Sequence, residues 1–340
     1  MQHSSLASSL VAEKTPKSPF NSTQKTYDFI IVGAGIVGLA TAYKLHQKFS
    51  DATILVLEKE GRVGAHQTGK NSGVIHSGIY YKPGSYKAKN CRDGRLQLVD
   101  FCNEHEVAME VCGKVIVATK EEELTRLDGI YERGIQNQIE GIGLIDPSEL
   151  AEIEPHVKGV KAIHVPCSGI VDYVGMCDRM MDIIEADGRG LVQFGARVHA
   201  IRESASEVLV QAGNNTYKGR YLINCAGLYC DHVAKSAGLN SPVKIVPFKG
   251  EYYELKPEAE YLVKHLIYPL PNPEFPFLGV HFTRMALGGI ECGPNAVFVF
   301  KREGYEKFAF DFKESLESLT FPGFWKMATK HWRMGLDEYK

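Results

Sequence analysis

YDFIIVGAGIVG, residues 27–38, is the stretch that decides the fold of this sequence. Its apolar run at 27–32 has the composition of a strand buried on both faces. Glycines follow at once with the spacing Gly-x-Gly-x-x-Gly, and apolar residues then recur at helical spacing through about Lys48. Strand, glycine turn and helix in this order predict the first half of a dinucleotide-binding βαβ unit.

Each glycine of the motif has its own geometric task. Gly33 permits the tight turn, Gly35 lets the backbone approach a pyrophosphate, and Gly38 allows the helix to pack closely on the strand. A second buried strand at 53–57 ends at Glu58, whose carboxylate can accept hydrogen bonds from an adenosine ribose and would repel a 2′-phosphate. A glycine-rich turn without a ligand is the alternative, and it leaves this acid unexplained.

The loop at 61–85 favours FAD over NAD. It is dense in Gly, Ser, Asn and His, whereas a plain NAD domain would soon continue into another βα crossover. Small polar residues can run along an extended cofactor and bind it through backbone amides. A mobile surface loop is the alternative, and the apolar Val74, Ile75 and Ile79 argue against it. A further strand at 221–224 ends in small residues that suit close approach of a ligand.

Composition and charge argue against several other classes. A net charge of -2 with scattered basic residues gives no reason to expect nucleic acid. No apolar run approaches the roughly 18 residues of a membrane-spanning helix, although peripheral membrane association stays open. The eight cysteines include no C-x-x-C pair, and without a Cys/His cluster we expect no metal.

The chain is long enough for two domains of ordinary size. We expect helices near 86–106, 120–138 and 172–187, and strands at 114–118 and between 191 and 224. The expected organisation is a disordered or targeting segment at 1–26, an FAD-binding domain at 27–110 and 165–242, a β-rich substrate-binding domain at 111–164 and 243–315, and an amphipathic helix at 316–340.

Several longer stretches carry a resemblance that covers roughly residues 27–340. They are HQTGKNSGVIHSGIYYKP at 66–83, GIVDY at 169–173, IVPFKG at 245–250, FPFLGVHFT at 275–283 and GPNA at 293–296. With these stretches the sequence resembles the FAD-dependent D-amino-acid oxidase/glycine oxidase superfamily and, within it, the L-2-hydroxyglutarate dehydrogenase family.

The resemblance implies an α/β fold: an FAD-binding Rossmann-like domain of the GR2/DAO type with an interleaved β-rich substrate domain. It implies oxidation of L-2-hydroxyglutarate to 2-oxoglutarate, with hydride passing from C2 to flavin N5, electrons leaving to an unidentified acceptor, and a mitochondrial location in eukaryotes. The residues it implies for the cofactor are Gly33, Gly35, Gly38, Glu58 and Lys59 at the ADP half, Thr68, Asn71, Ser72 and Gly73 along the pyrophosphate and flavin, Val198 at adenine, and Ala226 and Gly227 near the ribityl chain.

Two departures from the family pattern are visible. Lys249 stands where the family usually has Arg, so the charge is kept and the bidentate fork is lost. Family members also continue past Lys340, so we expect the C-terminal strand and helix of the FAD domain to be missing. Two alternatives therefore stay open: a related FAD-dependent amino-acid or amine oxidase, and an inactive, truncated product of the same family.

The implied reaction also needs a proton acceptor and cations for two carboxylates. His76 and His281 are candidate bases, because an imidazole suits proton removal near neutral pH. Lys249 is a candidate carboxylate partner, together with Lys82 and Arg284. The alternative for each is a packed or solvated side chain.

Overall fold

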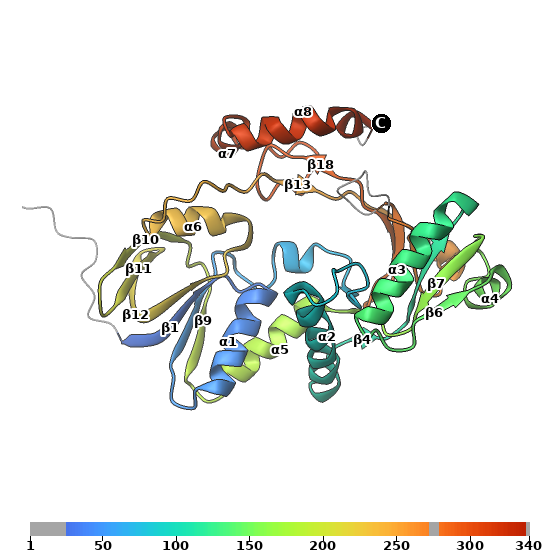
Figure 1. Cartoon of the computed structure of the whole chain (residues 1–340). Helices are drawn as coiled ribbons and strands as arrows, with labels where there is room; N and C mark the ends of the chain where they lie inside the picture. Colours follow the sequence, from blue (N-terminus) through green and yellow to red (C-terminus); the bar gives the residue numbers. More distant parts are fainter. Residues whose placement is uncertain (1–24, 272–278, 338–340) are drawn as a thin grey trace, which may run out of the picture.

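The computed structural model describes residues 25–271 and 279–337 (Figure 1). Two large sheets lie at opposite ends of the molecule, and the segment at 61–85 lies between them. Most of the expected targeting segment, and the first four residues of the stretch at 275–283, lie outside the described residues.

The first sheet is built around β1, a strand of apolar residues buried on both faces. β1 pairs in parallel with β2 on one side and with β12 on the other, and β2 pairs in parallel with β9. Beyond β12 the pairing is antiparallel. In spatial order the strands are β10 (Val198–Glu203), β11 (Val208–Ala212), β12 (Asn215–Asn224), β1 (Thr26–Val32), β2 (Ile54–Leu57) and β9 (Gly190–Gln193).

Helices α1 (Ile36–Lys48) and α5 (Tyr173–Glu185) pack together on one face of this sheet. Leu39 of α1 and Met176 of α5 are buried in one core cluster with the strand residues. Helix α5 begins at Asp172, whose carboxylate accepts a hydrogen bond from the Val174 amide at 3.0 Å. The predicted strand, helix and second strand of the βαβ unit are therefore confirmed.

The second large sheet is mixed and lies between two helices. Its strands, in spatial order, are β14 (Tyr253–Glu254), β17 (Ile290–Gly293), β16 (His281–Arg284), β15 (Leu266–Pro269), β5 (Lys114–Ala118), β7 (Lys161–Val165) and β6 (Gly143–Ile145). Leu127 of α3 (Leu124–Gln136) is buried with residues of one face, and Leu150 of α4 (Pro147–Ile153) with residues of the other.

A small sheet joins the two large ones. It is formed by β3 (Val74–Ile75), β8 (Gly169–Val171) and β4 (Met109–Glu110), and it runs beside α2 (Tyr86–Glu104). Because β3 continues the loop that follows β2, this sheet fixes that loop against the body of the molecule. Short 3-10 helices complete the connections: η1 (Gln67–Gly69), η2 (Glu121–Glu123), η3 (Gly227–Tyr229) and η4 (Pro257–Leu262).

The C-terminal layer, residues 297–337, lies above the space between the large sheets (Figure 1). It contains β18 (Val297–Phe298), which pairs with β13 (Phe248–Lys249), and the helices α7 (Phe312–Leu319) and α8 (Pro322–Asp337). Arg302 ties the layer to α6 (Cys230–Ser236) through two bonds to Asp231, at 2.5 and 2.8 Å.

The single helix predicted at 316–340 is wrong in its start and its continuity. The carboxylate of Asp311 accepts a hydrogen bond from the Glu314 amide at 2.9 Å, so α7 begins already at Phe312. Pro322 then starts the second helix, because proline is well suited to a first helical position.

Two further features of the described residues are the exposed edge formed by the end of β12 and the result of a search for membrane-spanning helices. Residues 220–224 of β12 pair with β1 alone, and Tyr221 there is 62% exposed. Among the helices that the structure describes, none is long and apolar enough to cross a bilayer.

Candidate functional site

The glycine turn after β1 is too tight for side chains. Gly33 has a φ of +105°, and a Cβ there would lie 2.5 Å from the Cys225 carbonyl oxygen. A Cβ at Gly38 would lie 1.9 Å from the carbonyl oxygen of Gly33. The turn therefore packs directly against the end of β12, as the sequence predicted from the motif spacing.

Glu58 points into this turn. Its side chain is buried, with Oε2 accepting from the Ala34 amide at 2.7 Å and Oε1 from the Glu60 amide at 2.9 Å. Two backbone donors thus orient the carboxylate at the carboxyl ends of β1 and β2. The remaining lone pairs of such a carboxylate can accept further hydrogen bonds from a ligand's hydroxyl groups.

The N-terminus of α1 has the features of an anion site. Its N-cap is Gly35, which offers no side-chain cap, and its first turn contains no acid. The Ile36 amide donates to Thr68 Oγ1 at 3.0 Å, which brings the loop after β2 alongside the helix end. Free amides at a helix N-terminus, together with the helix dipole, favour a phosphate group.

The loop at 66–73 is held by its own side chains. Asn71 Nδ2 donates to the carbonyl oxygens of Gln67 and Thr68 at 2.9 and 2.6 Å, and its Oδ1 accepts from the Gly73 amide at 2.8 Å. Gly73 has a φ of +64°, and a Cβ there would lie 2.8 Å from the Val171 carbonyl oxygen. Ser72 lies in the same turn.

Residues from the other half of the sheet approach the same place. Gly227, with a φ of +53°, lies opposite Gln67, since its Cβ would be 3.1 Å from Gln67 Oε1. Ala226 precedes it directly after β12. Val198 begins β10, and the segment before it pairs with the end of β2, where the Ala196 amide donates to the Glu58 carbonyl oxygen at 2.7 Å.

These features together fit a dinucleotide. A strand end, a helix N-terminus without a side-chain cap from its own N-cap residue, an oriented carboxylate and two glycine turns meet at the carboxyl edge of the first sheet. In open α/β sheets ligands bind outside this edge, and we call this place the crevice. Apart from Lys59, the cofactor-binding residues predicted from the sequence lie around this crevice. Their contacts to a ligand stay predictions.

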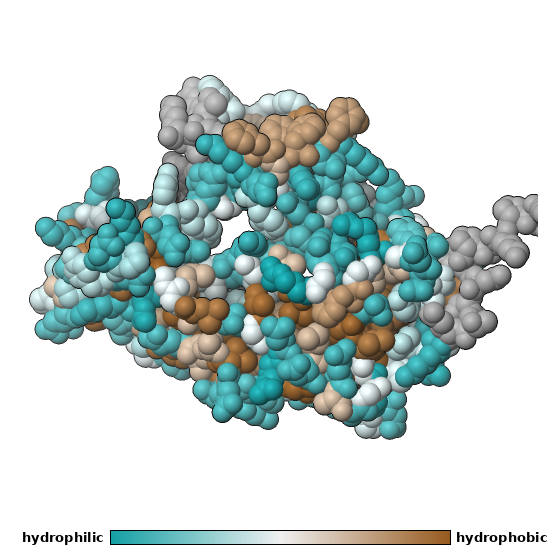
Figure 2. Space-filling model, turned by 180° about the vertical axis from the view of Figure 1, so that it is seen from behind, coloured by the Kyte–Doolittle hydropathy of each residue, from teal (hydrophilic) through white to brown (hydrophobic). Residues whose placement is uncertain are grey.

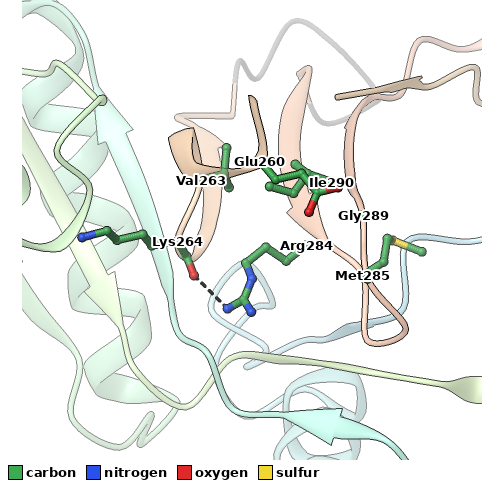
Figure 3. Close-up of a pocket in the computed structure, with 8 residues that line it drawn as sticks. Glu260, Val263, Lys264, Arg284, Met285, Gly289 and Ile290 are labelled. Atoms are coloured by element: carbon green, nitrogen blue, oxygen red, sulfur yellow. Dashed lines mark hydrogen bonds between the residues drawn. The ribbon is translucent and has the colours of Figure 1, made fainter. Parts of the chain in front are cut away.

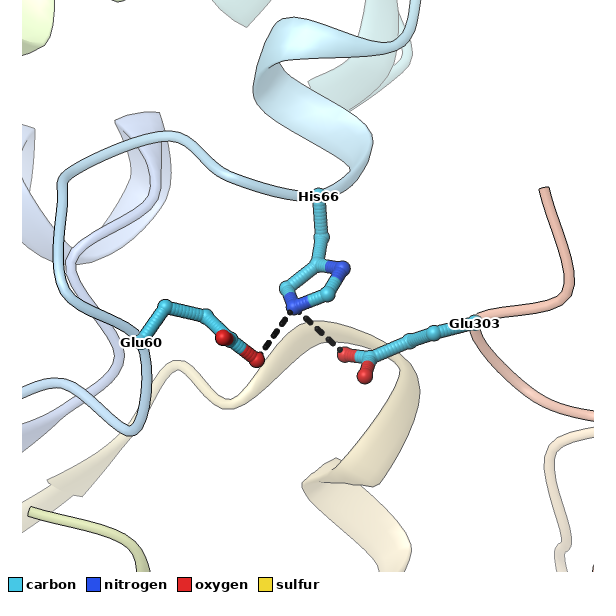
Figure 4. Close-up of side chains that lie close together, drawn as sticks. All are labelled: Glu60, His66 and Glu303. Carbon is cyan, nitrogen blue, oxygen red and sulfur yellow. Dashed lines mark hydrogen bonds and ion pairs between the residues drawn. The ribbon is translucent and has the colours of Figure 1, made fainter. Parts of the chain in front are cut away.

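Lys59, also predicted to bind the cofactor, lies in a cluster of charges whose other members, Glu60, His66 and Glu303, are drawn in Figure 4. Its ammonium is 2.6 Å from Glu60, 2.7 Å from His66 Nε2 and 2.8 Å from Glu303. Hydrogen bonds from Lys59, and then from His66, lower the pKa of Glu60 to about 2. Glu60, His66 and Glu303 have metal-ligand spacing, but the ammonium already occupies the space between them.

His76 and His281 come from different parts of the chain. His76 follows β3, whereas His281 starts β16 of the second sheet and its ring stacks on Tyr268 at 4.0 Å between centroids. His281 Nδ1 lies 2.9 Å from the Gly279 carbonyl oxygen. A carbonyl oxygen only accepts, so Nδ1 carries the proton, and the neutral ring offers Nε2 as an acceptor.

Both imidazoles are held in the neutral form. Protein atoms surround the ring of His76 on most sides although solvent reaches it, and this burial, with the charges of Lys114 and His281, lowers its pKa to about 4. Burial and, to a smaller extent, the charge of Lys114 also lower the pKa of His281. Both rings are therefore available as proton acceptors at neutral pH.

Lys114 is the residue that sequence reasoning missed. It is fully buried at the start of β5, with its ammonium 5.0 Å from the ring centroid of Tyr80 and 4.8 Å from that of Tyr268. A charged residue at the head of the apolar strand Lys114–Ala118 was the available signal. We call His76, Tyr80, Lys114, Tyr268 and His281 the histidine site.

The cations predicted as carboxylate partners lie elsewhere or already have partners. Lys249 is paired with Glu251 at 2.9 Å, and Lys82 is exposed. Arg284 binds both carboxylate oxygens of Glu110, at 2.9 and 3.0 Å. The structure thus does not bring Arg284 into the histidine site.

Arg284 instead lines a pocket of about 410 Å³ on the second sheet (Figure 3). Charged side chains and glycine backbone border this pocket, including Glu260, Lys264 and Gly289. Neither candidate histidine is among its lining residues. The pocket is therefore distinct from the histidine site.

The view from behind shows an opening through the molecule beneath the C-terminal layer (Figure 2). In Figure 1 the segment at 61–85, drawn in light blue, lies below this space and between the sheets. Crevice and histidine site are both joined to this segment, the first through Thr68 and Asn71, the second through His76 and Tyr80.

Comparison with known proteins gives a consistent result. Residues 28–332 match the protein family described as FAD dependent oxidoreductase. The chain is 50% identical over 313 residues to an L-2-hydroxyglutarate dehydrogenase of Indibacter alkaliphilus, covering 92% of this chain and 78% of the relative. It is 42% identical to the mitochondrial L-2-hydroxyglutarate dehydrogenase of Homo sapiens, covering 94% of this chain and 71% of that protein.

Solved structures share the fold at lower identity. L-alpha-glycerophosphate oxidase from Mycoplasma pneumoniae, with FAD bound, superposes with a TM-score of 0.75 at 24% identity, covering 89% of this chain and 78% of the other. Glycine oxidase from Geobacillus kaustophilus gives a TM-score of 0.69 at 18% identity, covering 82% and 74%.

Proposed function

The chain belongs to the FAD-dependent oxidoreductase family and, within it, to the L-2-hydroxyglutarate dehydrogenases, and from this premise we propose that it oxidises L-2-hydroxyglutarate to 2-oxoglutarate. The observation that carries the proposal is the 50% identity to such an enzyme over 92% of the chain. The neutral histidine pair beside a buried cation supports it, because the reaction removes a proton from an anionic hydroxy acid.

FAD is the cofactor of this family, and when bound it accepts the hydride from C2 of the substrate at flavin N5. Gly33, Gly35, Gly38 and Glu58 would hold its ADP half. Thr68, Asn71, Ser72 and Gly73 would bind the pyrophosphate and flavin, with Val198 at adenine and Ala226 and Gly227 at the ribityl chain. Lys59 would support this side by holding Glu60 and Glu303 together.

Removal of the hydroxyl proton is assigned to the histidine site. Of the two imidazoles, His281 has the better-defined geometry, because its Nδ1–H is fixed by Gly279 and Nε2 is left as the acceptor. His76, which follows the cofactor loop directly, would orient the hydroxyl group or accept the proton in its place. A positioned base of this kind typically contributes about 10²–10⁴-fold to a rate.

Two carboxylates of the substrate need positive partners. Lys249 stays a candidate, although its ammonium is 2.9 Å from Glu251 and a substrate carboxylate would have to displace that acid. Charge-assisted hydrogen bonds of this kind are typically worth about 1.5–3 kcal/mol.

The experiment is an anaerobic substrate screen on FAD-loaded protein, followed by the absorbance of the oxidised flavin. We expect bleaching with L-2-hydroxyglutarate and none with D-2-hydroxyglutarate, glycine or sarcosine. Bleaching by the amines alone would assign the chain to an amine oxidase, and a chain that FAD cannot reconstitute would remove the proposal.

The location is proposed from the relatives. Those of Bos taurus, Homo sapiens and Mus musculus are named mitochondrial, whereas the bacterial ones carry no such word. We infer a mitochondrial location if this chain is eukaryotic, and co-migration of the expressed protein with mitochondrial markers on fractionation would test it. Respiratory reoxidation assays with isolated membranes would identify the electron acceptor.

A further inference from the structure

The ammonium of Lys114 is a buried charge without a counter-ion. It has no solvent-exposed surface, and within the described part of the chain no carboxylate and no hydrogen-bond acceptor contacts Nζ. Its ammonium instead lies over two aromatic rings, 5.0 Å from the centroid of Tyr80 and 4.8 Å from that of Tyr268. Burial lowers the pKa of Lys114 to about 8, so it is still mostly charged at pH 7.

Such a buried charge destabilises the folded chain. Taking an ion out of water costs free energy, and the cation–π contacts with two rings offset only part of this cost. A methionine of similar size would fill the same space without that penalty. Lysine at this place is therefore poorly explained by stability and well explained by a negative charge that arrives with a ligand.

Other buried polar atoms without a hydrogen-bond partner support the same interpretation. In the part of the chain that the structure describes, Ser77 Oγ and the Tyr80 hydroxyl are also buried without a hydrogen-bond partner. Both lie in the segment that carries His76. Unsatisfied buried polar groups are rare in native proteins, and two of them, Lys114 Nζ and the Tyr80 hydroxyl, belong to residues in contact with each other, as expected of a site for a polar ligand.

The two rings connect the cation to the histidines. Tyr268 lies between Lys114 and His281, with the imidazole stacked on it at an interplanar angle of 21°. Tyr80 follows His76 by four residues in the same segment, and its ring centroid lies 5.0 Å from the ammonium. The ammonium thus contacts two rings, one stacked on His281 and the other four residues after His76 in sequence.

We propose that Lys114 is a positioning residue for the substrate: its buried ammonium attracts one carboxylate of L-2-hydroxyglutarate to the histidine site and so selects an anionic hydroxy acid. This inference rests on the proposed function. A single positive charge acting over roughly 6–12 Å at an effective dielectric constant of about 20 changes anion affinity by about 10- to 100-fold.

The test uses Lys114→Met in the FAD-loaded protein, with glutarate as a dicarboxylate that cannot be oxidised. Its dissociation constant is measured from the perturbation of the flavin absorption spectrum. We expect it to rise about 10- to 100-fold in the variant. Lys161→Met is the matched control, because Lys161 lies on the adjacent strand β7 but pairs with Asp128 at 3.1 Å, and its glutarate affinity should stay unchanged.

A second readout separates this role from a purely structural one. Removing an uncompensated buried charge should raise the melting temperature of the ligand-free Lys114→Met protein at pH 7, whereas loss of a structural residue would lower it. Should the methionine variant fail to hold FAD, Lys114→Gln, which is neutral and polar, replaces it with the same expected loss of affinity.

Unchanged glutarate binding in a folded, FAD-loaded variant would overturn the inference, as would a lower melting temperature with both neutral substitutions. The proposed function is tested separately by the wild-type protein. If L-2-hydroxyglutarate bleaches the wild-type flavin while the variant binds glutarate normally, only the role of Lys114 is wrong. If it does not bleach the wild-type flavin, the substrate itself is wrong.

Discussion

The crevice at the glycine turn and the histidine site differ in how the chain builds them. The crevice is formed largely by residues 33–73, whose positions follow from backbone geometry: positive φ angles, close backbone contacts and an uncapped helix. The histidine site joins residues as far apart in sequence as His76 and His281. There, a buried charge and stacked rings decide the properties.

This difference predicts which substitutions each region tolerates. In the crevice a single added methyl group causes a steric conflict, so the expected losses concern folding and cofactor binding. In the histidine site the side chains can be replaced by others of similar size, so the expected losses concern rate and affinity. Mutations in the two regions should therefore separate flavin content from turnover.

The largest effect is expected for Gly38→Ala. Its Cβ would lie 1.9 Å from the Gly33 carbonyl oxygen, so α1 has to move away from the turn. We expect loss of bound FAD, measured as flavin absorbance per protein after purification. Gly94→Ala is the control, since nothing lies within 4 Å of a Cβ there and alanine favours the helix. Normal flavin content in Gly38→Ala would contradict the assignment of the crevice.

The next effect is expected for His281→Asn. Without an imidazole at this place, the rate of flavin reduction by L-2-hydroxyglutarate should fall about 10²–10⁴-fold while FAD stays bound. Stopped-flow absorbance measures the rate. His156→Gln, an exposed histidine, should leave it unchanged. If His76→Asn, and not His281→Asn, shows the loss, the base assignment moves to His76.

A smaller effect is expected for Glu58→Gln. Both carboxylate oxygens accept backbone amides, so the amide nitrogen of glutamine must face one of these donors. The charged acceptor for the cofactor's hydroxyl groups is also lost, and a hydrogen bond to a charged group is worth about 1.5–3 kcal/mol, which predicts FAD affinity lower by about 10- to 100-fold. Equilibrium titration of the apoprotein with FAD measures it. The rate of flavin reduction at saturating FAD should change little. A large change in this rate would contradict the view that the crevice determines cofactor binding and the histidine site determines turnover.

The smallest effect concerns pH. Because the pKa values of His76 and His281 are lowered, their rings stay neutral below the ordinary value of 6.5, and the acid limb of flavin reduction should lie below pH 6.5. In Lys114→Met a positive charge that lowers both pKa values is absent, so the acid limb should move to higher pH. A limb that does not move would show that Lys114 does not act on the histidines.

The sequence was sufficient for the crevice because its determinants are local. Gly33, Gly38 and Glu58 lie within one βαβ unit, and the spacing alone predicts their meeting. Lys114 could not be placed in this way, because its neighbour Tyr268 reaches it through the parallel pairing of β5 with β15. No local pattern reveals such a pairing.

The predicted cations show the same limit. The charges of Lys249 and Arg284 near the family motifs predict carboxylate partners for a substrate, but in the structure each already pairs with a carboxylate of the chain itself, Glu251 and Glu110. Sequence shows that a charge is present, whereas only the fold shows whether it is already neutralised. The charge without a carboxylate partner is that of Lys114, which in the sequence is simply the first residue of an apolar strand.

The most direct measurement is a rapid-mixing experiment on the FAD-loaded protein with L-2-hydroxyglutarate carrying hydrogen or deuterium at C2, without oxygen. If the crevice and the histidine site act together on one substrate, the flavin is reduced, one 2-oxoglutarate forms per flavin, and deuterium slows the reduction. A flavin that stays oxidised in the presence of saturating L-2-hydroxyglutarate would contradict this.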